Sequence, residues 1–194
     1  GSIIFTKHNL CNWKNFNQEI NLLKNEILKS KEVSRPFTTL SIFDSLSLQK
    51  TSAQINVKNN KEIINLKEKK FIQNKNKKIR LGYYSADFRK HAMSYLLVKM
   101  FELHDKSKFE LFAFSFGPQT NDYIQKKILS TFDKFIDVRE KTDHEIAQLS
   151  QELKIDIAID LMGFTKFNRF RIFIEKCAPI QINYLGYPGT VGSK

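Results

Sequence analysis

The sequence has 194 residues, 41% of them apolar, and a formal net charge of +12 at pH 7. This length and apolar content allow one full hydrophobic core with a smaller appended module, but not two large domains. No apolar run approaches the roughly 18 residues that a membrane-spanning helix needs, so we expect no membrane contact. Cys11 and Cys177 lie far apart, and neither has a second Cys nearby at metal-ligand spacing. They give no sign of a disulfide framework and favour a reducing compartment.

The positive charge is concentrated in the N-terminal part of the chain. Sixteen of the 32 Lys and Arg residues, but only six of the 20 Asp and Glu residues, lie at or before Arg80. The densest basic segment is KEKKFIQNKNKKIR, residues 67–80. A solvated helix end and linker is the preferred interpretation, with polyanion contact or a docking surface for another part of the chain as alternatives. The charge therefore gives little reason to expect a nucleic-acid partner.

A mainly helical extension is predicted first in the chain. Apolar residues recur at spacings of three and four in NWKNFNQEINLLKNEILKS, residues 12–30, which indicates an amphipathic helix. Residues 30–45 contain Pro36 and small polar residues, so we expect a loop there. A second helix is predicted at about 46–71.

After Lys78 the pattern changes to short apolar strands that alternate with helical segments. The expected strands are IRLGYYS, FELFAFSFG, KFIDV, DIAIDLMG and PIQINYLG. Asp143 is the expected N-cap of the helix before the fourth strand. The alternation predicts an α/β fold, a Rossmann-like parallel sheet with helices on both faces and strand order 3-2-1-4-5. The predicted domains are a helical extension or linker, 1–77, and a Rossmann-like domain, 78–194.

Three segments follow the ends of strands in this predicted sheet: SADFRKH, DLMGFTK and GYPGT. Ligands of such sheets bind beyond the carboxyl ends of the strands, where the winding direction reverses. Because the first and fourth strands are neighbours in the predicted order, the first two segments should meet at that crevice.

His91 is the only one of the four histidines in these segments, and an imidazole can accept or donate a proton near neutral pH. The alternative is a solvated or structural loop histidine. Asp87 either caps the following helix and shapes the loop or orients the imidazole, and we favour the first of these roles.

Asp160 ends an apolar strand and is followed by Gly163 and Thr165. Gly163 allows close backbone approach and the Thr165 hydroxyl can bind a ligand, but a carboxylate that ties down its own loop is an equal alternative for Asp160. In GYPGT, Pro188 followed by Gly189 fits a type II turn. Its glycines would also let a ligand approach the main chain.

The sequence lacks the motifs of several common nucleotide sites and enzyme classes. No G-x-G-x-x-G follows a strand, and neither a P-loop nor a G-x-S-x-G elbow is found, which argues against a self-contained dinucleotide site, a P-loop fold and an α/β-hydrolase. Asp156 and Asp160 point the same way on one strand and are interpreted as strand ends. We therefore expect no metal site.

The segments KIRLGYYSADFRKHAMSYLL, DIAIDLMGFTKFNRFRIF and APIQINYLGYPGTVGS, in this order and spacing, resemble the catalytic region of the O-linked N-acetylglucosamine transferase/SPINDLY family. The resemblance covers residues 78–194. CNWKNF and RPFTTLSIFDS resemble the segment that joins the tetratricopeptide repeats of this family to its catalytic core.

The resemblance implies the N-terminal lobe of a two-lobed, metal-independent GT-B glycosyltransferase of the inverting type, which transfers a sugar to Ser or Thr hydroxyls of an acceptor protein. The donor would be a nucleotide sugar, UDP-N-acetylglucosamine first, used as a substrate and not as a cofactor. The partners expected are a C-terminal catalytic lobe and N-terminal tetratricopeptide repeats. The isolated lobe would be inactive or nearly so, and the setting cytoplasmic.

Carried over residue by residue, His91 matches the active-site histidine of the family, either a general base or a group that positions donor and acceptor. The implied substrate-binding residues are Asp160, Gly163, Thr165, Tyr187, Pro188, Gly189 and Thr190. Arg169 matches an arginine interpreted as structural.

Phe167 replaces a usual Gly, and Lys176 with Cys177 replaces a usual Arg-Pro. Phe167 adds bulk beside the expected cleft, so GDP-fucose or UDP-glucose stays open as donor. A non-catalytic binding module that uses the basic extension is the alternative from another class.

Overall fold

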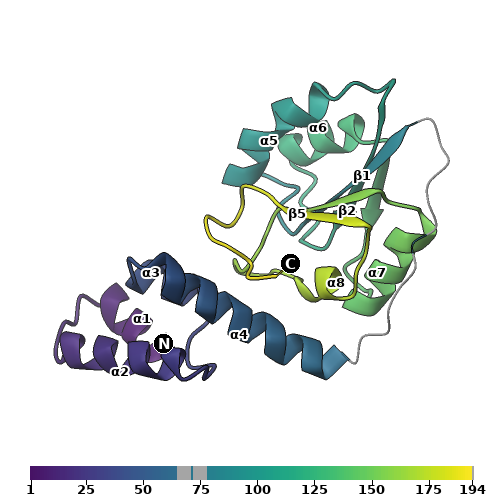
Figure 1. The fold of residues 1–194 in the computed structure, drawn as a ribbon. Coiled ribbons are helices and arrows are strands. Elements are labelled where there is room, and N and C mark those ends of the chain that lie inside the picture. Colours follow the sequence, from purple (N-terminus) through teal and green to yellow (C-terminus); the bar gives the residue numbers. More distant parts are fainter. Residues whose placement is uncertain (65–70, 72–77, 194) are drawn as a thin grey trace. The chain divides into compact units, whose positions relative to one another are not determined.

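The computed structural model describes residues 1–64, 71 and 78–193 (Figure 1). Contacts within the chain define two compact units, the helical unit (Gly1–Asn65 with Pro188–Lys194) and the sheet unit (Leu66–Tyr187). The domain boundary predicted between 77 and 78 falls beside residues outside the described part, and it stays a prediction. Most of the basic segment 67–80 also lies outside the described residues.

The helical unit contains α1 (Ser2–Asn9), α2 (Phe16–Leu28), α3 (Pro36–Ile42) and α4 (Leu46–Ile64). Helices α2 and α4 were predicted from the sequence, whereas α1 was not. Apolar side chains from these helices and their connections form one core: Ile4, Leu23, Ile27, Phe43, Leu48 and Ile55. No helix of the described residues is both long and apolar enough to cross a bilayer.

Helix α3 corrects the loop expected over residues 30–45. Pro36 occupies the first turn of this helix, where its fixed φ suits the helix and its missing N–H costs no hydrogen bond. The buried Thr39 hydroxyl lies 3.0 Å from the Ser52 hydroxyl, which ties α3 to α4. The proline therefore starts a helix here instead of excluding one.

The sheet unit contains a fully parallel sheet of β1 (Ile79–Ser85), β2 (Phe109–Ser115), β3 (Lys134–Asp137), β4 (Ile157–Asp160) and β5 (Ile180–Asn183). The strand order is β3-β2-β1-β4-β5, as predicted. The chain leaves the central strand β1 toward β2 and later returns to its other side through β4, which places the reversal of winding between β1 and β4.

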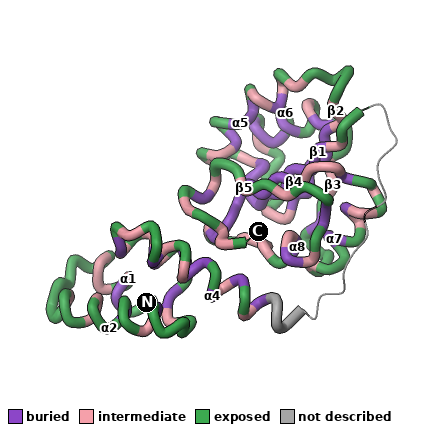
Figure 2. Tube along the Cα trace, viewed as in Figure 1, coloured by how far each residue is buried: buried purple, intermediate pink, exposed green. Residues whose placement is uncertain are grey.

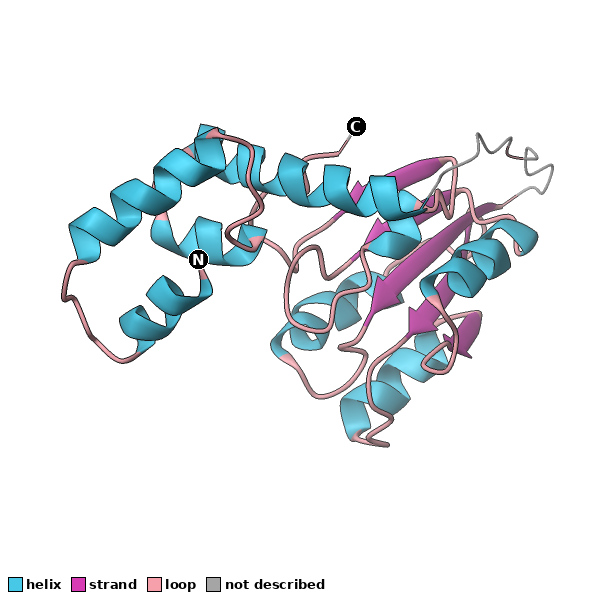
Figure 3. Cartoon of the chain, turned by 90° about the horizontal axis from the view of Figure 1, so that it is seen from below, coloured by secondary structure: helices cyan, strands magenta, loops and turns pink. Residues whose placement is uncertain are grey.

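Helices cover both faces of the sheet: α5 (Ala92–Glu102) and α6 (Tyr123–Thr131) on one face, α7 (Asp143–Glu152) and α8 (Arg171–Ile174) on the other (Figures 1 and 3). Alternate strand residues point to opposite faces, so Tyr83 packs in the core under α5 and α6, while Tyr84 packs in the core under α7 and α8. The strands are consequently buried in the middle of the unit, as Figure 2 shows. This confirms the predicted α/β fold.

The N-cap of α7 differs by one residue from the prediction. Thr142 is the N-cap, and it forms a capping box with Glu145. Asp143 instead accepts a 2.6 Å hydrogen bond from Arg169 Nε, and the same guanidinium donates to the carbonyls of Val138 (3.2 Å) and Lys141 (2.6 Å). Arg169 therefore fastens the β3–α7 connection, in line with the structural role implied for it.

Candidate functional site

The candidate site lies at the carboxyl edge of the sheet, where β1 and β4 end side by side. Tyr84 is paired with Asp160, which is paired on its other side with Asn183. The two following loops touch, because the Ser85 hydroxyl donates to Met162 Sδ at 3.5 Å. This contact confirms that the SADFRKH and DLMGFTK segments meet, as the strand order predicted.

The Asp160 side chain is turned into its own loop. Its residue is only 6% exposed, and its carboxylate accepts hydrogen bonds from the backbone N–H groups of Met162 (2.9 Å) and Gly163 (3.1 Å). The Thr165 hydroxyl donates to the Met162 carbonyl at 2.8 Å. Both side chains therefore shape the loop from within.

Burial raises the pKa of Asp160 to about 6, although the two backbone N–H groups and the nearby Asn183 amide favour the charged form. Asn183 Nδ2 is close enough to the carboxylate to act on its pKa, yet it is buried and makes no hydrogen bond of good geometry among the described residues. This amide therefore stabilises the carboxylate only weakly. Asp160 therefore changes its charge close to neutral pH.

Both the backbone conformation at position 163 and the lack of room for a side chain there require glycine. Its φ is +53°, and a Cβ added to it would lie 2.4 Å from Tyr187 Cβ. Tyr187 is itself 5% exposed and packs edge-on against Phe164, with 5.5 Å between ring centroids. Burial raises the pKa of Tyr187. Tyr187 therefore closes over the β4 loop and fixes the shape of that loop.

His91 is the N-cap of α5. Its Nδ1 accepts a 3.3 Å hydrogen bond from the Met93 N–H and lies 3.7 Å from Asp87 Oδ2. Because Nδ1 is the acceptor, a neutral imidazole carries its proton on Nε2. The side chain is 38% exposed. Nε2 can therefore donate a hydrogen bond to a substrate oxygen without breaking the cap.

Asp87 does not cap α5, contrary to the capping role favoured from the sequence. Its buried carboxylate pairs with Arg89 Nη2 at 3.2 Å, its N–H donates to the Ser85 hydroxyl at 2.9 Å, and its carbonyl accepts from the Ser94 hydroxyl. These bonds shape the loop between β1 and α5 and hold Asp87 beside the imidazole. The loop-structuring part of the expectation is thus confirmed.

The GYPGT segment is divided between the two units. Tyr187 ends the sheet unit, whereas Pro188, Gly189 and Thr190 belong to the helical unit, which is described separately. Only Gly163 and Gly192 have positive φ among the glycines of the described residues, so Gly189 is not the third residue of a type II turn. Thr190 Oγ1 accepts from the Gly192 N–H at 3.1 Å.

Sequence reasoning missed the part played by Asn183 and by Gly186. Asn183 is a polar residue that ends an apolar strand, which is the same signal that pointed to Asp160. A Cβ added to Gly186 would lie 1.8 Å from the Leu161 carbonyl oxygen, so the β5 loop passes directly against the β4 loop. That close approach has no signal in the sequence beyond the glycine itself.

Phe167 stands in the left-handed region with φ +64°, and it is 65% exposed. The Lys166 ammonium lies 4.8 Å from the centre of its ring. An aromatic residue rarely adopts this conformation, which glycine adopts freely. Phe167, which replaces the usual Gly, therefore places an exposed aromatic ring on a strained backbone two residues after Thr165.

Among the described residues, no three His, Cys, Asp or Glu side chains gather in a way that could hold a metal ion. Cys11 is exposed, Cys177 is buried, and both are free.

Comparison with known protein families shows which family the chain belongs to. The family model described as glycosyl transferase family 41 matches residues 43–194. The chain belongs to glycosyltransferase family 41. This agrees with the resemblance found in the sequence, and the matched region includes every candidate site residue.

Curated proteins that are similar to the chain carry the names of peptide N-acetylglucosaminyltransferases. A probable UDP-N-acetylglucosamine–peptide N-acetylglucosaminyltransferase SEC from Arabidopsis thaliana is 37% identical over 117 residues, 60% of this chain and 12% of that protein. The Caenorhabditis elegans enzyme of that name is 33% identical over 121 residues, 60% of this chain and 10% of that protein. A probable SPINDLY from Arabidopsis thaliana is 30% identical over 117 residues, 59% of this chain and 13% of that protein. The chain therefore spans only about a tenth of these relatives.

A solved structure of an O-GlcNAc transferase supports the fold. A mutant of the Thermobaculum terrenum O-GlcNAc transferase superposes with a TM-score of 0.69 at 22% identity, over 84% of this chain and 29% of that one. At this level of identity the similarity establishes the architecture of the chain, that of a GT-B lobe, and nothing about its substrates.

The raised pKa of Asp160 predicts a specific dependence of stability on pH. The folded state binds the proton more tightly than the unfolded chain, whose Asp titrates near 3.8, so stability should fall as pH rises from about 4 through about 6. The expected contribution is about 3 kcal/mol, at 1.36 kcal/mol per pKa unit. Urea unfolding of the wild type and of Asp160→Asn across pH 3.5 to 7.5 measures it. The difference between the two curves should change with pH, and parallel curves would contradict the prediction.

Gly163→Ala should destabilise the sheet unit by about 2–4 kcal/mol, because the added methyl meets Tyr187 and the backbone has φ +53°. Gly189→Ala is the matched control, since Gly189 lacks positive φ. The denaturation midpoint of each variant is the measurement. Equal midpoints for the two variants would show that the β4 loop adapts to a side chain at Gly163.

Proposed function

We propose that the full-length protein is a protein O-glycosyltransferase, in which this chain contributes the N-terminal lobe. The observation that carries the proposal is the family 41 match over residues 43–194, together with the meeting of the His91 and Asp160 loops at the carboxyl edge of the sheet. The relatives are named for UDP-N-acetylglucosamine and peptide, so these are the proposed donor and acceptor, with Ser or Thr as the reacting residue.

In the proposed reaction, the acceptor hydroxyl oxygen forms a bond to the anomeric carbon of the sugar. The bond from that carbon to the diphosphate breaks, the nucleoside diphosphate leaves with the electron pair of that bond, and the hydroxyl proton passes to the departing diphosphate. This requires an aligned acceptor and stabilisation of the developing negative charge. No metal is part of the proposal. A C-terminal lobe would supply most of the contacts to the diphosphate.

His91 is the proposed catalytic residue of this lobe. With Nδ1 occupied by the Met93 N–H, its Nε2–H is set to hold a substrate oxygen. A role as general base would require the cap to open, so that Nδ1 carries the proton and Nε2 accepts one. The geometry therefore favours positioning over proton abstraction.

The β4 loop is proposed as a rigid wall for the substrate. Asp160 and Thr165 hold its shape from inside, and Gly163 with Tyr187 fixes how closely the main chain approaches. Pro188, Gly189 and Thr190 are proposed to continue this binding surface. A cytoplasmic setting and N-terminal tetratricopeptide repeats complete the proposal.

The test compares nucleotide release from UDP-N-acetylglucosamine, UDP-glucose and GDP-fucose by the full-length protein, with acceptor protein present. We expect release from one donor, with mass spectrometry placing the sugar on Ser or Thr. His91→Ala and His91→Asn should both lower the rate about a hundredfold or more.

His91→Asn separates loss of the imidazole from loss of folding stability. Asn is among the best N-cap residues, whereas Ala removes the cap of α5 and lowers the free energy of unfolding by about 1 kcal/mol. Full activity in His91→Asn would remove the imidazole from the mechanism. No release from any donor by folded protein would overturn the proposed function.

A further inference from the structure

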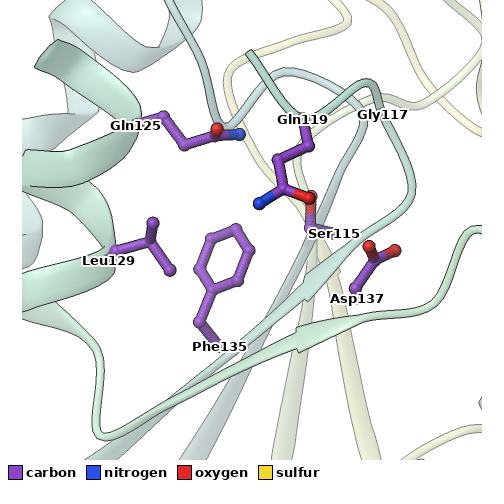
Figure 4. Close-up of a pocket in the computed structure, with 7 residues that line it drawn as sticks. All are labelled: Ser115, Gly117, Gln119, Gln125, Leu129, Phe135 and Asp137. Atoms are coloured by element: carbon purple, nitrogen blue, oxygen red, sulfur yellow. The ribbon is translucent and has the colours of Figure 1, made fainter. Parts of the chain in front are cut away.

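The sheet unit has a cavity at the carboxyl ends of β2 and β3, on the other side of β1 from Asp160. It has a volume of about 120 Å³ and is lined by Ser115, Gln119, Gln125, Leu129, Phe135 and Asp137 (Figure 4). Pockets for whole small molecules begin at roughly 300 Å³. The cavity therefore accommodates one side chain, not a nucleotide.

The lining is mixed, with apolar side chains from Leu129 and Phe135 and polar ones from Ser115, Gln119, Gln125 and Asp137. Leu129 and Phe135 supply apolar surface, and the Ser115 hydroxyl, in a residue that is 6% exposed, has no hydrogen-bond partner among the described residues. At the rim, Asp137 pairs with Arg139 at 2.6 Å, and this ion pair lowers the pKa of Asp137, which stays charged and neutralised. A neutral side chain with an apolar body, such as Val, Thr or Leu, suits this lining.

The amide of Gln125 forms part of the wall without being available to a ligand. Its Nε2 donates to the Phe88 carbonyl at 3.0 Å, and its Oε1 accepts from the N–H groups of Thr120 (3.0 Å) and Asn121 (2.8 Å). Gln125 therefore joins α6 to the loop that carries His91.

Two further contacts join that loop to α6 and to a residue that lines the cavity. Asp122 Oδ2 accepts a 2.8 Å hydrogen bond from the N–H of Lys90, the residue before His91. The ring centroids of Phe88 and Phe135 are 5.8 Å apart. The SADFRKH segment thus contacts the Asp160 loop through Ser85, and contacts residues that line the cavity through Phe88.

The spacing of the strands gives the distance between the two sites. Ser115 is paired with Ser85 on β1, and β1 is paired with β4, which ends at Asp160. Two strand spacings of about 4.8 Å place the cavity about 10 Å from the Asp160 end. An extended polypeptide advances about 3.3 Å per residue, so this distance corresponds to about three residues.

We infer that this cavity is a subsite for the acceptor polypeptide, which receives a neutral side chain about three residues from the glycosylated Ser or Thr. The inference rests on the proposed function, since it presumes a polypeptide laid along the carboxyl edge of the sheet. Leu129 and Ser115 are then specificity-determining residues that touch the acceptor and take no part in the chemical step.

Leu129→Trp in the full-length protein tests the subsite. Leu129 is 40% exposed, so a larger ring can fill the cavity from α6 without disturbing the core. The control is Leu103→Trp, because Leu103 is 71% exposed and follows the end of α5, at the opposite edge of the sheet.

Transfer is measured with two kinds of acceptor peptide. The long peptides carry Val, Lys or Trp in turn at each position up to five residues on either side of the reacting Ser or Thr. The short peptide has only two residues on each side of the reacting Ser or Thr. The wild type should prefer Val at a position about three residues away. Leu129→Trp should raise KM for the long Val peptide about tenfold, the size expected from blocking an apolar pocket, and should abolish its advantage over the short peptide. Leu103→Trp should keep the advantage.

Equal KM values for Leu129→Trp and Leu103→Trp, with wild-type transfer intact, would overturn the subsite and leave the proposed function standing. Absence of nucleotide release in the wild type with every donor would overturn the proposed function, and the subsite with it.

Discussion

The central position of β1 in a parallel sheet is the constraint on which the rest of this structure depends. Because β1 pairs with β2 on one side and β4 on the other, two segments that are distant in the sequence end at the same edge. The loop after β1 carries His91, and the loop after β4 carries Asp160. A different neighbour for β1 would separate these loops and leave neither with a partner.

The β4 loop obtains its rigidity at the expense of stability. Asp160 places a carboxylate in a buried environment, where the charged form is disfavoured, and Gly163 requires a conformation that other residues adopt only with strain. Both features position backbone N–H groups and the Tyr187 ring in a fixed arrangement. Such local costs are typical of sites where the backbone itself faces a ligand.

The His91 loop has a structural part that the hydrogen bonds show and a chemical part that is proposed. The imidazole caps α5 through Nδ1, and its Nε2 makes no part of that cap, while Asp87, Ser85 and Ser94 hold the loop through hydrogen bonds. Through Gln125 and Asp122 the same loop is joined to α6. A change in α6 can therefore reach the His91 loop through hydrogen bonds within a single unit.

The sequence by itself determined the order of strands and helices, because alternating apolar patterns and short polar connections follow from local physics. It also identified His91 and the DLMGFTK segment, since polar residues that directly follow apolar strands are visible without a structure. Local signals failed where one residue type is common in two kinds of structure. Proline occurs both in loops and in the first turn of a helix, and Pro36 starts a helix. Thr and Asp are both common N-cap residues, and Thr142, not Asp143, caps α7. Only the tertiary structure decided that Asp160 and Thr165 turn inward, that His91 uses Nδ1 as a cap, and that Ser115 lines a cavity with Leu129. Each of these depends on which loops and helices meet in space, and a sequence pattern does not contain that information.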